Sequence, residues 1–481
     1  MAISRISGEV NTTFTPSDND ARPVERWSRW NIGRIRLFGV FVHFKYFVLL
    51  LAELAVITGA IFFCYSQATV EHPQAAGWLL AKSLLAAGPL SLCFAGLGLY
   101  SSRQTLTVSG VLARYLVASV ITLPILTTAY FLLQAYVTAT DFIIPVAIAI
   151  LMLAGLRMLF GRFLDSNLLK RRVLLIGSGE KAADVRKVAN DPDQRGFSLI
   201  NTSVDFKEAR TLAAVVKRHR INEVVVAFDD RRKTLPAKQL LDCRLSGISV
   251  VEVLDFLERE SGVIPFEHLQ PSWLIFTDGF SVNIFAKIAK RTFDITAALI
   301  LILISLPLIL LTALAIRLDF RSKGPVFYKQ VRVGLDGKYF NVLKFRSMRT
   351  DAEVDGQAQW ATQNDSRVTA VGAVLRKYRI DEVPQLFNVL LGSMSLVGPR
   401  PERPVFVSAL SELNELYNER HRVKPGVTGW AQLRFPYTDN EEDSIQKLQY
   451  DMYYLKNQGF FFDVYILLQT IEVVLFGKGS R

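Results

Sequence analysis

Long runs of apolar residues dominate the first third of this chain, at about residues 44–66, 77–100, 110–136 and 141–164. Each run can supply the ~20 residues that an α-helix needs to cross the hydrocarbon core of a bilayer. The pattern therefore predicts four transmembrane helices in the region 44–166.

Basic residues in the connecting segments indicate the orientation of these helices. Lys and Arg precede the first run, follow the fourth, and flank the connection between the second and third. The other two connections, near Glu71 and Thr138, contain neither residue type. Under the positive-inside rule, the polar segment 1–43 and everything after the fourth helix are predicted to be cytoplasmic. No cleavable signal peptide is evident in the first forty residues.

A fifth apolar run covers about residues 294–316 and contains Pro307 near its middle. Proline removes a backbone hydrogen bond there, and Ser305 can donate to a freed carbonyl. Basic residues stand on both sides of the run, at Lys287, Lys290, Arg291, Arg317, Arg321 and Lys323. We therefore expect a re-entrant helix that bends near Ser305 and Pro307 and returns to the same face. The alternative is an ordinary span with a proline kink.

Two further segments complete the expected architecture. Residues 167–280 alternate short apolar strands with helical segments, which predicts a Rossmann-like, doubly wound α/β domain. Gly177 and Gly179 follow its first strand in a Gly-x-Gly-x-x-Ala turn of the kind that holds a nucleotide pyrophosphate. A tight turn without a nucleotide is the equally weighted alternative. The last apolar run, 460–476, has polar interruptions and is predicted to lie in the membrane interface.

Composition supports a membrane protein with anionic partners. Half of the residues are hydrophobic and the formal net charge is +12. Such a charge suits phospholipid headgroups, phosphorylated substrates or nucleic acid. Because the cations cluster at the membrane flanks and around one pair of adjacent acidic residues, Asp381 and Glu382, we expect no nucleic-acid partner. The three cysteines are scattered without metal or redox spacing.

The C-terminal region, 281–481, contains the candidate chemistry. Pro384 is comfortable only in the first turn of a helix, so a helix is predicted to begin near Asp381 and Glu382 and to run to about Leu391. Both carboxylates would then lie at a helix N-terminus, where the dipole stabilises anions. The alternative interpretation is that Asp381 only caps this helix. Several cations occur on either side in sequence, namely Lys344, Arg346, Arg376, Lys377, Arg400 and Arg403.

Paired carboxylates among cations are typical of phosphate chemistry. The cations neutralise charge on a phosphoryl group, and a divalent metal can bridge carboxylate and pyrophosphate oxygens. A carboxylate can also attack phosphorus directly.

Six ordered motifs in this region resemble the polyprenyl-phosphate hexose-1-phosphate transferases, large monotopic phosphoglycosyl transferases that initiate bacterial exopolysaccharide synthesis. The motifs are GPVFYKQVRVG (324–334), KFRSM (344–348), NDSRVT (364–369), LRKYRIDEVPQL (375–386), MSLVGPRPERP (394–404) and VKPGVTGWAQ (423–432). The resemblance implies an α-rich catalytic domain, with the re-entrant helix as its anchor, at the cytoplasmic face of the bacterial inner membrane.

The resemblance also implies roles for individual residues. Asp381 corresponds to the nucleophile that attacks a UDP-sugar, releases UMP and forms a phosphosugar-enzyme intermediate. Glu382 corresponds to its partner, which helps to hold Mg²⁺ or to handle protons. Lys344, Arg376 and Arg400 match phosphate-binding cations, and Arg346 and Arg403 join them as candidates. The acceptor implied is undecaprenyl phosphate.

The chain departs from the family pattern in two places. The membrane helix reads Ser305-Leu306-Pro307, where the family commonly has Ser-Pro adjacent. The segment 433–437 reads Leu-Arg-Phe-Pro-Tyr, which leaves the sugar undefined. Asp451 is either a site residue or a helix-surface charge, and the apolar spans offer a surface through which two copies could form a homodimer.

Two other classes of function were considered. A membrane nucleotide-sugar dehydratase or epimerase would need a Tyr-x-x-x-Lys pair, which the sequence lacks. A non-catalytic regulator of polysaccharide export would tolerate Asp381→Asn.

Overall fold

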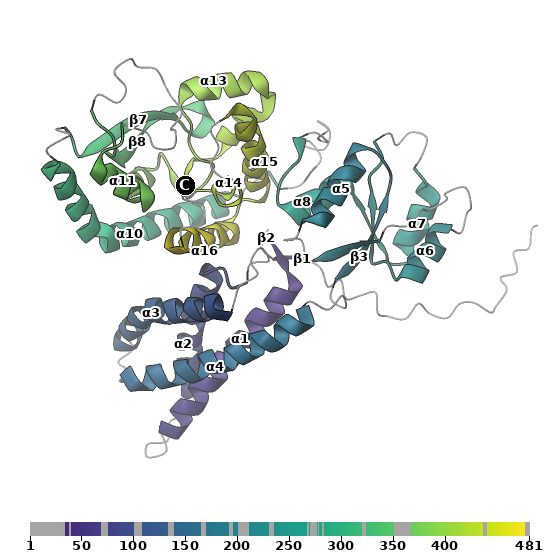
Figure 1. Cartoon of the computed structure of the whole chain (residues 1–481), viewed down its shortest axis with the longest axis horizontal. Helices are drawn as coiled ribbons and strands as arrows, with labels where there is room; N and C mark the ends of the chain where they lie inside the picture. The colour runs from purple at the N-terminus through teal and green to yellow at the C-terminus, as the bar shows by residue number, and fades with distance from the viewer. Residues whose placement is uncertain are drawn as a thin grey trace, which may run out of the picture.

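The structure is a computed structural model with three parts: a bundle of long helices, a sheet domain and a larger C-terminal domain (Figure 1). It describes residues 34–37, 40–68, 76–100, 108–132, 139–164, 170–191, 196–200, 211–229, 235–266, 269, 277, 279–280, 283–319, 324–350, 367–435 and 440–476. Most of the N-terminal segment 1–43 and the first half of the NDSRVT motif lie outside these residues.

The predicted N-terminal helices are present. A short antiparallel hairpin, β1 (Arg34–Leu37) and β2 (Val40–His43), precedes them. They are α1 (Phe44–Ala68), α2 (Ala76–Gly96), α3 (Val108–Leu132) and α4 (Ala139–Leu164). The first three contain stretches long and apolar enough to cross a membrane, whereas the apolar stretch of α4 is the shorter Ile144–Phe160.

A buried carboxylate joins all four helices of this bundle. Glu53 of α1 is fully buried, and its two oxygens accept hydrogen bonds from Arg157 of α4 at 2.6 Å, Tyr115 of α3 at 3.1 Å and Tyr100, just after α2, at 2.5 Å. A charge inside an apolar bundle persists only with such partners. The contacts therefore hold the four helices in one arrangement.

The middle domain has a parallel sheet covered by helices on both faces. Its strands β3 (Arg171–Ile176), β4 (Phe197–Ile200), β5 (Glu223–Val226) and β6 (Ser249–Glu252) follow the spatial order β4-β3-β5-β6. One apolar cluster joins the sheet to α5 (Glu180–Asn190) and α8 (Val253–Ser261). The opposite cluster joins it to α6 (Thr211–His219) and α7 (Ala237–Leu245). This is the layering that the alternation of segments predicted.

A 35-residue helix, α10 (Ile284–Leu318), leads into the C-terminal domain. Figure 1 shows that it bends and that its end turns back towards β7, β8 and α11. Ala298 of the first part belongs to the main C-terminal core, while Ile309 and Ile316 pack with Phe345 and Leu375. Both parts of α10 are therefore attached to the same domain.

The hydrogen bonds of Ser305 differ in detail from the expectation. Pro307 leaves the carbonyl of Leu303 without its helical partner, but Ser305 Oγ donates to the carbonyls of Leu301 at 2.6 Å and Ile302 at 3.3 Å. Ser305 thus makes an ordinary bond back to the preceding turn, which favours bending without compensating for the proline.

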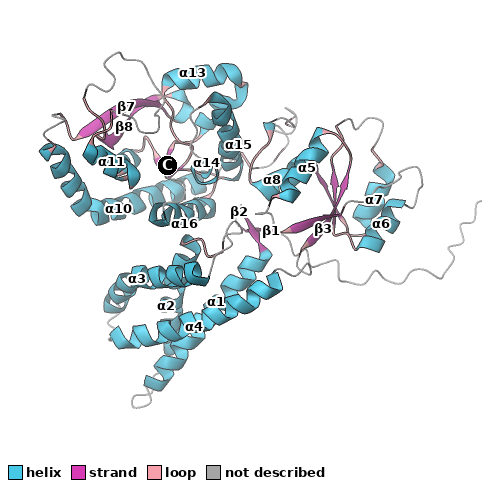
Figure 2. Ribbon diagram, in the orientation of Figure 1, coloured by secondary structure: helices cyan, strands magenta, loops and turns pink. Residues whose placement is uncertain are grey.

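The C-terminal domain combines two small sheets with short helices (Figure 2). The antiparallel pair is β7 (Phe327–Val333) and β8 (Tyr339–Phe345), and the parallel pair is β9 (Ser395–Val397) and β10 (Gly426–Thr428). The helices and turns are η4 (Leu335–Gly337), α11 (Ala370–Lys377), η5 (Ile380–Glu382), α12 (Gln385–Leu391), α13 (Pro404–Leu413), η6 (Glu415–Arg422), α14 (Trp430–Arg434), α15 (Glu441–Asn457) and α16 (Phe460–Phe476).

Polar contacts dock the middle domain onto α15 and α14. Lys456 Nζ lies 2.6 Å from Glu258 of α8, and Trp430 Nε1 donates to the carbonyl of Gly262 at 2.8 Å. The helix α16 contributes Phe462 and Ile466 to the C-terminal core and packs against α2, where Leu468 meets Gly96.

Candidate active site

The carboxylate pair lies on a 3₁₀ turn just before a helix. Arg379 adopts a left-handed conformation with φ 54° and turns the chain out of α11 into η5, which contains Asp381 and Glu382. Pro384 then stands at the N-cap of α12, without a side-chain capping bond. The predicted helix therefore begins at Gln385, a few residues later than expected, because the proline ring favours the position at which a helix starts. Asp381 does not cap α12, so that alternative is wrong.

The helix α12 is held from two sides. Asn388 Nδ2 donates to the carbonyl of Asn341 at 2.7 Å, and its Oδ1 accepts from the backbone N–H of Leu343 at 2.9 Å. From α10, Arg291 donates to the carbonyls of Val389 at 2.6 Å and Leu390 at 2.8 Å, at the end of the helix. These contacts fix the pair relative to β8, the strand that carries Lys344.

Glu382 is surrounded by cations. Its Oε1 lies 3.0 Å from Arg400 and 3.4 Å from Lys344, and its Oε2 lies 4.0 Å from Arg379. Burial of the side chain, which is 12% exposed, raises the pKa of Glu382, but the three cations outweigh it and hold the pKa well below its usual range. Glu382 is therefore a fixed negative charge.

Asp381 behaves differently from its neighbour. It is 9% exposed, and among the described residues it forms no ion pair within 4 Å. Burial and then the charge of Glu382 raise the pKa of Asp381 above its ordinary value, partly opposed by Lys344, Arg376 and Arg400. Two adjacent carboxylates thus have opposite shifts, a pattern typical of distinct catalytic roles.

The predicted cations divide into two groups. Lys344, Arg376 and Arg400 act electrostatically on Asp381, and Lys344 and Arg400 also contact Glu382. Burial lowers the pKa of Lys344, an effect that Glu382 opposes and Arg400 strengthens. These three residues and the carboxylate pair form one cluster.

Arg346 and Arg403 have different surroundings. Arg346 is buried beside Gly324 and Thr350, and burial lowers its pKa against the opposing charge of Asp319. Arg403 stands at the N-cap of α13. Among the described residues, neither contacts Asp381 or Glu382. That both bind phosphate stays a prediction.

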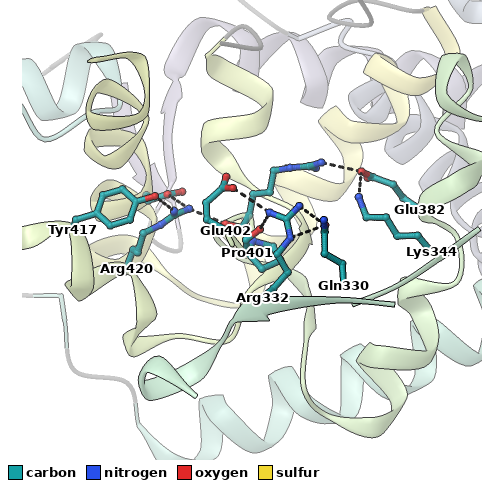
Figure 3. Close-up of polar contacts among 10 residues, drawn as sticks. Gln330, Arg332, Lys344, Glu382, Pro401, Glu402, Tyr417 and Arg420 are labelled. Carbon is teal, nitrogen blue, oxygen red and sulfur yellow. Dashed lines mark hydrogen bonds and ion pairs between the residues drawn. The ribbon is translucent and has the colours of Figure 1, made fainter. Parts of the chain in front are cut away.

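A second polar network adjoins the cluster, and the sequence analysis did not predict it. Figure 3 shows it running from Glu382 and Lys344 past Arg332 and Glu402 to Arg420 and Tyr417. Arg332 binds a carbonyl 69 residues away in sequence, and Arg420 binds a carbonyl 20 residues away. No local sequence pattern therefore reveals these two contacts.

Asp451 belongs to this network. It is 2% exposed and lies 2.8 Å from Arg420. Burial raises the pKa of Asp451, which Arg420 opposes. The interpretation of Asp451 as a helix-surface charge is therefore wrong.

The glycine turn of the middle domain is occupied by a side chain of the same domain. Asp229, after β5, accepts hydrogen bonds from the backbone N–H groups of Glu180 at 3.1 Å and Lys181 at 3.3 Å. A Cβ on Gly179 would lie 1.7 Å from Asp229 Oδ2. The amides at the start of α5 that a pyrophosphate would use are bound by a carboxylate, which favours the tight-turn interpretation.

Comparison with known proteins identifies the C-terminal part. The family model for bacterial sugar transferases matches residues 285–477. A UDP-N-acetylgalactosamine-undecaprenyl-phosphate N-acetylgalactosaminephosphotransferase of Aeromonas hydrophila is 43% identical over 50% of this chain and 56% of its own length. A UDP-glucose:undecaprenyl-phosphate glucose-1-phosphate transferase of Escherichia coli (strain K12) is 37% identical over 60% of this chain and 61% of its own.

A shorter relative is matched almost throughout. The uncharacterized sugar transferase EpsL of Bacillus subtilis (strain 168) is 42% identical over 40% of this chain and 91% of its own length. The chain thus spans less than two thirds of the first two relatives, but nearly all of the third. The match to nearly the whole of this relative, together with the family match to the domain that contains the cluster of carboxylates and cations, shows that the chain belongs to the bacterial sugar transferase family.

Proposed function

We propose that this protein transfers a hexose-1-phosphate from a UDP-sugar to undecaprenyl phosphate, giving undecaprenyl-diphosphate-sugar and UMP and initiating exopolysaccharide synthesis. The observation that carries the proposal is the asymmetry of the carboxylate pair: Glu382 is held ionised by cations, while Asp381 is left without an ion pair among the described residues. The names of the two longer relatives, which are undecaprenyl-phosphate sugar phosphotransferases, support the same reaction.

In the first step, a carboxylate oxygen of Asp381 attacks the phosphorus next to the sugar. The new P–O bond forms as the bond to the bridging oxygen of the diphosphate breaks, and UMP leaves with those electrons. The raised pKa of Asp381 makes its carboxylate a better nucleophile once it is ionised. Lys344, Arg376 and Arg400 balance the charge that develops on the phosphoryl oxygens.

In the second step, a phosphate oxygen of undecaprenyl phosphate attacks the same phosphorus. The bond to Asp381 breaks, and the carboxylate is regenerated as the lipid diphosphate forms. The fixed charge of Glu382 keeps Lys344 and Arg400 in place between the two steps.

The pair also fits a magnesium ion. Mg²⁺ is usually bound by one or two carboxylates together with phosphate oxygens and water. Asp381 has no competing ion pair among the described residues, and Oε2 of Glu382 has only the distant Arg379 at 4.0 Å. Asp381 and Glu382 would hold the ion, which would supply positive charge to the diphosphate.

We propose that α10 is a re-entrant membrane helix. Many of its side chains are apolar and exposed, among them Leu303, Ile304, Leu310 and Leu311. Such a surface is stable in lipid and unfavourable in water. With both parts of α10 attached to one domain, the helix enters and leaves on the side of the active site, which we place at the cytoplasmic face of the inner membrane. The helix α16 then lies in the interface.

The test is the fate of the donor in the absence of lipid acceptor. Purified protein mixed with a UDP-sugar and quenched rapidly should release UMP and gain the mass of a phosphosugar. Asp381→Asn should give neither product, and the exposed Asp242→Asn should give both. Turnover of Asp381→Asn within about tenfold of wild type would contradict a nucleophilic role.

A further inference from the structure

Four consecutive carbonyls in the loop that carries Arg400 are each bound by a donor from another part of the domain. Gly426 N–H donates to Pro399 O at 2.9 Å, and Val333 N–H donates to Glu402 O at 3.0 Å. The two carbonyls between them accept from guanidinium groups: Arg420 donates to Arg400 O at 2.9 Å, and Arg332 donates to Pro401 O at 3.0 Å.

The loop sequence explains why side chains are needed. Pro399 and Pro401 have no N–H, so the loop cannot form a helix or a strand ladder. Its carbonyls are nevertheless next to buried residues, where a carbonyl without a hydrogen bond would destabilise the fold. A guanidinium is well suited because it donates in several fixed directions at once.

Each of the two arginines is itself fixed. Arg420 is buried, donates to Tyr417 Oη at 2.6 Å, and lies 2.8 Å from the carboxylate of Asp451. Its guanidinium stacks over the Tyr417 ring.

On the other side of the loop, Arg332 lies 3.2 Å from Glu402 and donates twice to Gln330 Oε1, at 2.7 and 3.1 Å. Neither side chain can move without breaking several bonds.

The carboxylates settle an electrostatic difficulty. Two additional cations beside Arg400 would repel its guanidinium if they were unpaired. Asp451 pairs with Arg420 and Glu402 pairs with Arg332, so each arginine beside the loop has a carboxylate partner. Arg400 and Lys344 both contact Glu382, at the place where the proposed phosphate chemistry needs positive charge.

We propose that Arg332 and Arg420 are positioning residues that hold the main chain of Arg400 from both sides and so set where its guanidinium meets Glu382 and the donor diphosphate. The inference rests on the proposed function for the identity of the donor. Neither arginine touches the reacting atoms, and both act through Arg400.

A double-mutant cycle separates this role from a general structural one. The variants are Arg420→Lys, Arg332→Lys and Arg400→Lys, with the two doubles that contain Arg400→Lys. Lysine keeps the charge but cannot donate in several fixed directions. Arg422→Lys is the matched control, because Arg422 lies in the same 3₁₀ helix with a side chain that is 74% exposed. The readout is kcat and KM for UMP release from a UDP-sugar.

We expect Arg420→Lys and Arg332→Lys each to lower kcat/KM at least about tenfold. If Arg400→Lys changes kcat, both variants should change kcat, and if it changes KM, both should change KM. Each double should lie within about threefold of Arg400→Lys alone, because the interaction is already lost. Losses that multiply in the doubles, or that appear in the other parameter, would overturn the positioning role. If one single variant fails to fold, the cycle through the other arginine decides the question.

The outcomes also distinguish the two proposals. A wild-type protein that releases no UMP from any UDP-sugar refutes the transferase. The other outcome is that the wild-type and Arg422→Lys proteins are active and that Arg420→Lys or Arg332→Lys is equally active. This result would refute only the positioning role.

Discussion

Lys344 and Glu382 meet at 3.4 Å although they are 38 residues apart and come from a strand and a 3₁₀ turn. The contact exists because α12 is bound to β8 by Asn388 and to α10 by Arg291. It turns a local carboxylate pair into a site with two unlike carboxylates, since among the described residues only Glu382 of the two forms ion pairs with the cations.

The pH dependence of turnover should respond to Glu382. The pKa of Asp381 is raised by burial and by the negative charge of Glu382, so activity should fall on acidification as Asp381 becomes protonated. Glu382→Gln removes that negative charge and leaves Arg400 and Lys344 unopposed, and both changes lower the pKa of Asp381. The acidic limb of the rate profile should therefore move to lower pH, even though the maximum rate falls. A limb that stays in place, or moves to higher pH, would show that Glu382 does not act on the titrating group.

The anchor of α12 should contribute to both stability and activity. Asn388→Ala removes two hydrogen bonds to β8 and leaves the Asn341 carbonyl and the Leu343 N–H without this partner, at a cost of about 2–3 kcal/mol. Thermal unfolding in detergent should show the loss, with a parallel decrease in UMP release. Leu391→Ala, in the same helix at an 83% exposed position, is the control and should change little. Equal effects of the two substitutions would contradict the anchoring role.

The middle domain should bind no dinucleotide through its glycine turn. The carboxylate of Asp229 occupies the amides that a pyrophosphate would need. Titration of the full chain with NADH, followed by its fluorescence, should show no saturable binding. Asp229→Ala should lower the stability of the domain by about 1 kcal/mol, as expected for the loss of a helix N-terminal acceptor, without changing turnover. Saturable NADH binding that Gly179→Ala abolishes would refute the tight-turn interpretation.

Topology should place the β7–β8 turn and the first helix connection on opposite sides. In a variant without the three native cysteines, Lys338→Cys should react with an impermeant maleimide only from the cytoplasmic side. Glu71→Cys should react only from the other side. Lys338 is exposed, whereas a side chain at Gly324 would meet Arg346 at 2.4 Å and disturb the site. Labelling of both positions from one side would contradict the proposed orientation.

The elements of this protein were largely predictable because their signals are local. Apolar runs predicted the N-terminal helices, and the alternation of short strands with helical segments predicted the layered middle domain. Pro384 predicted the start of α12 to within a few residues. This was possible because the proline ring constrains its own backbone wherever it occurs.

The composition of the site was only partly predictable. Lys344 and Arg346 are two residues apart, and both were expected near the carboxylates. Lys344 reaches Glu382, whereas Arg346, just beyond the end of β8, is buried under Gly324. The residue types of Lys344 and Arg346 do not indicate which of the two contacts Glu382.

The sequence by itself determined which segments are apolar, where helices and strands begin, and which residue types are available for phosphate chemistry, because each depends on neighbours along the chain. Only the tertiary structure decided that, among the described residues, Glu382 forms ion pairs and Asp381 forms none. It also decided that Asp229 occupies the glycine turn and that Arg332 and Arg420 donate to carbonyls in the loop of Arg400. Those relationships join residues tens of positions apart, and their geometry is set by packing between elements rather than by any preference of the residues themselves.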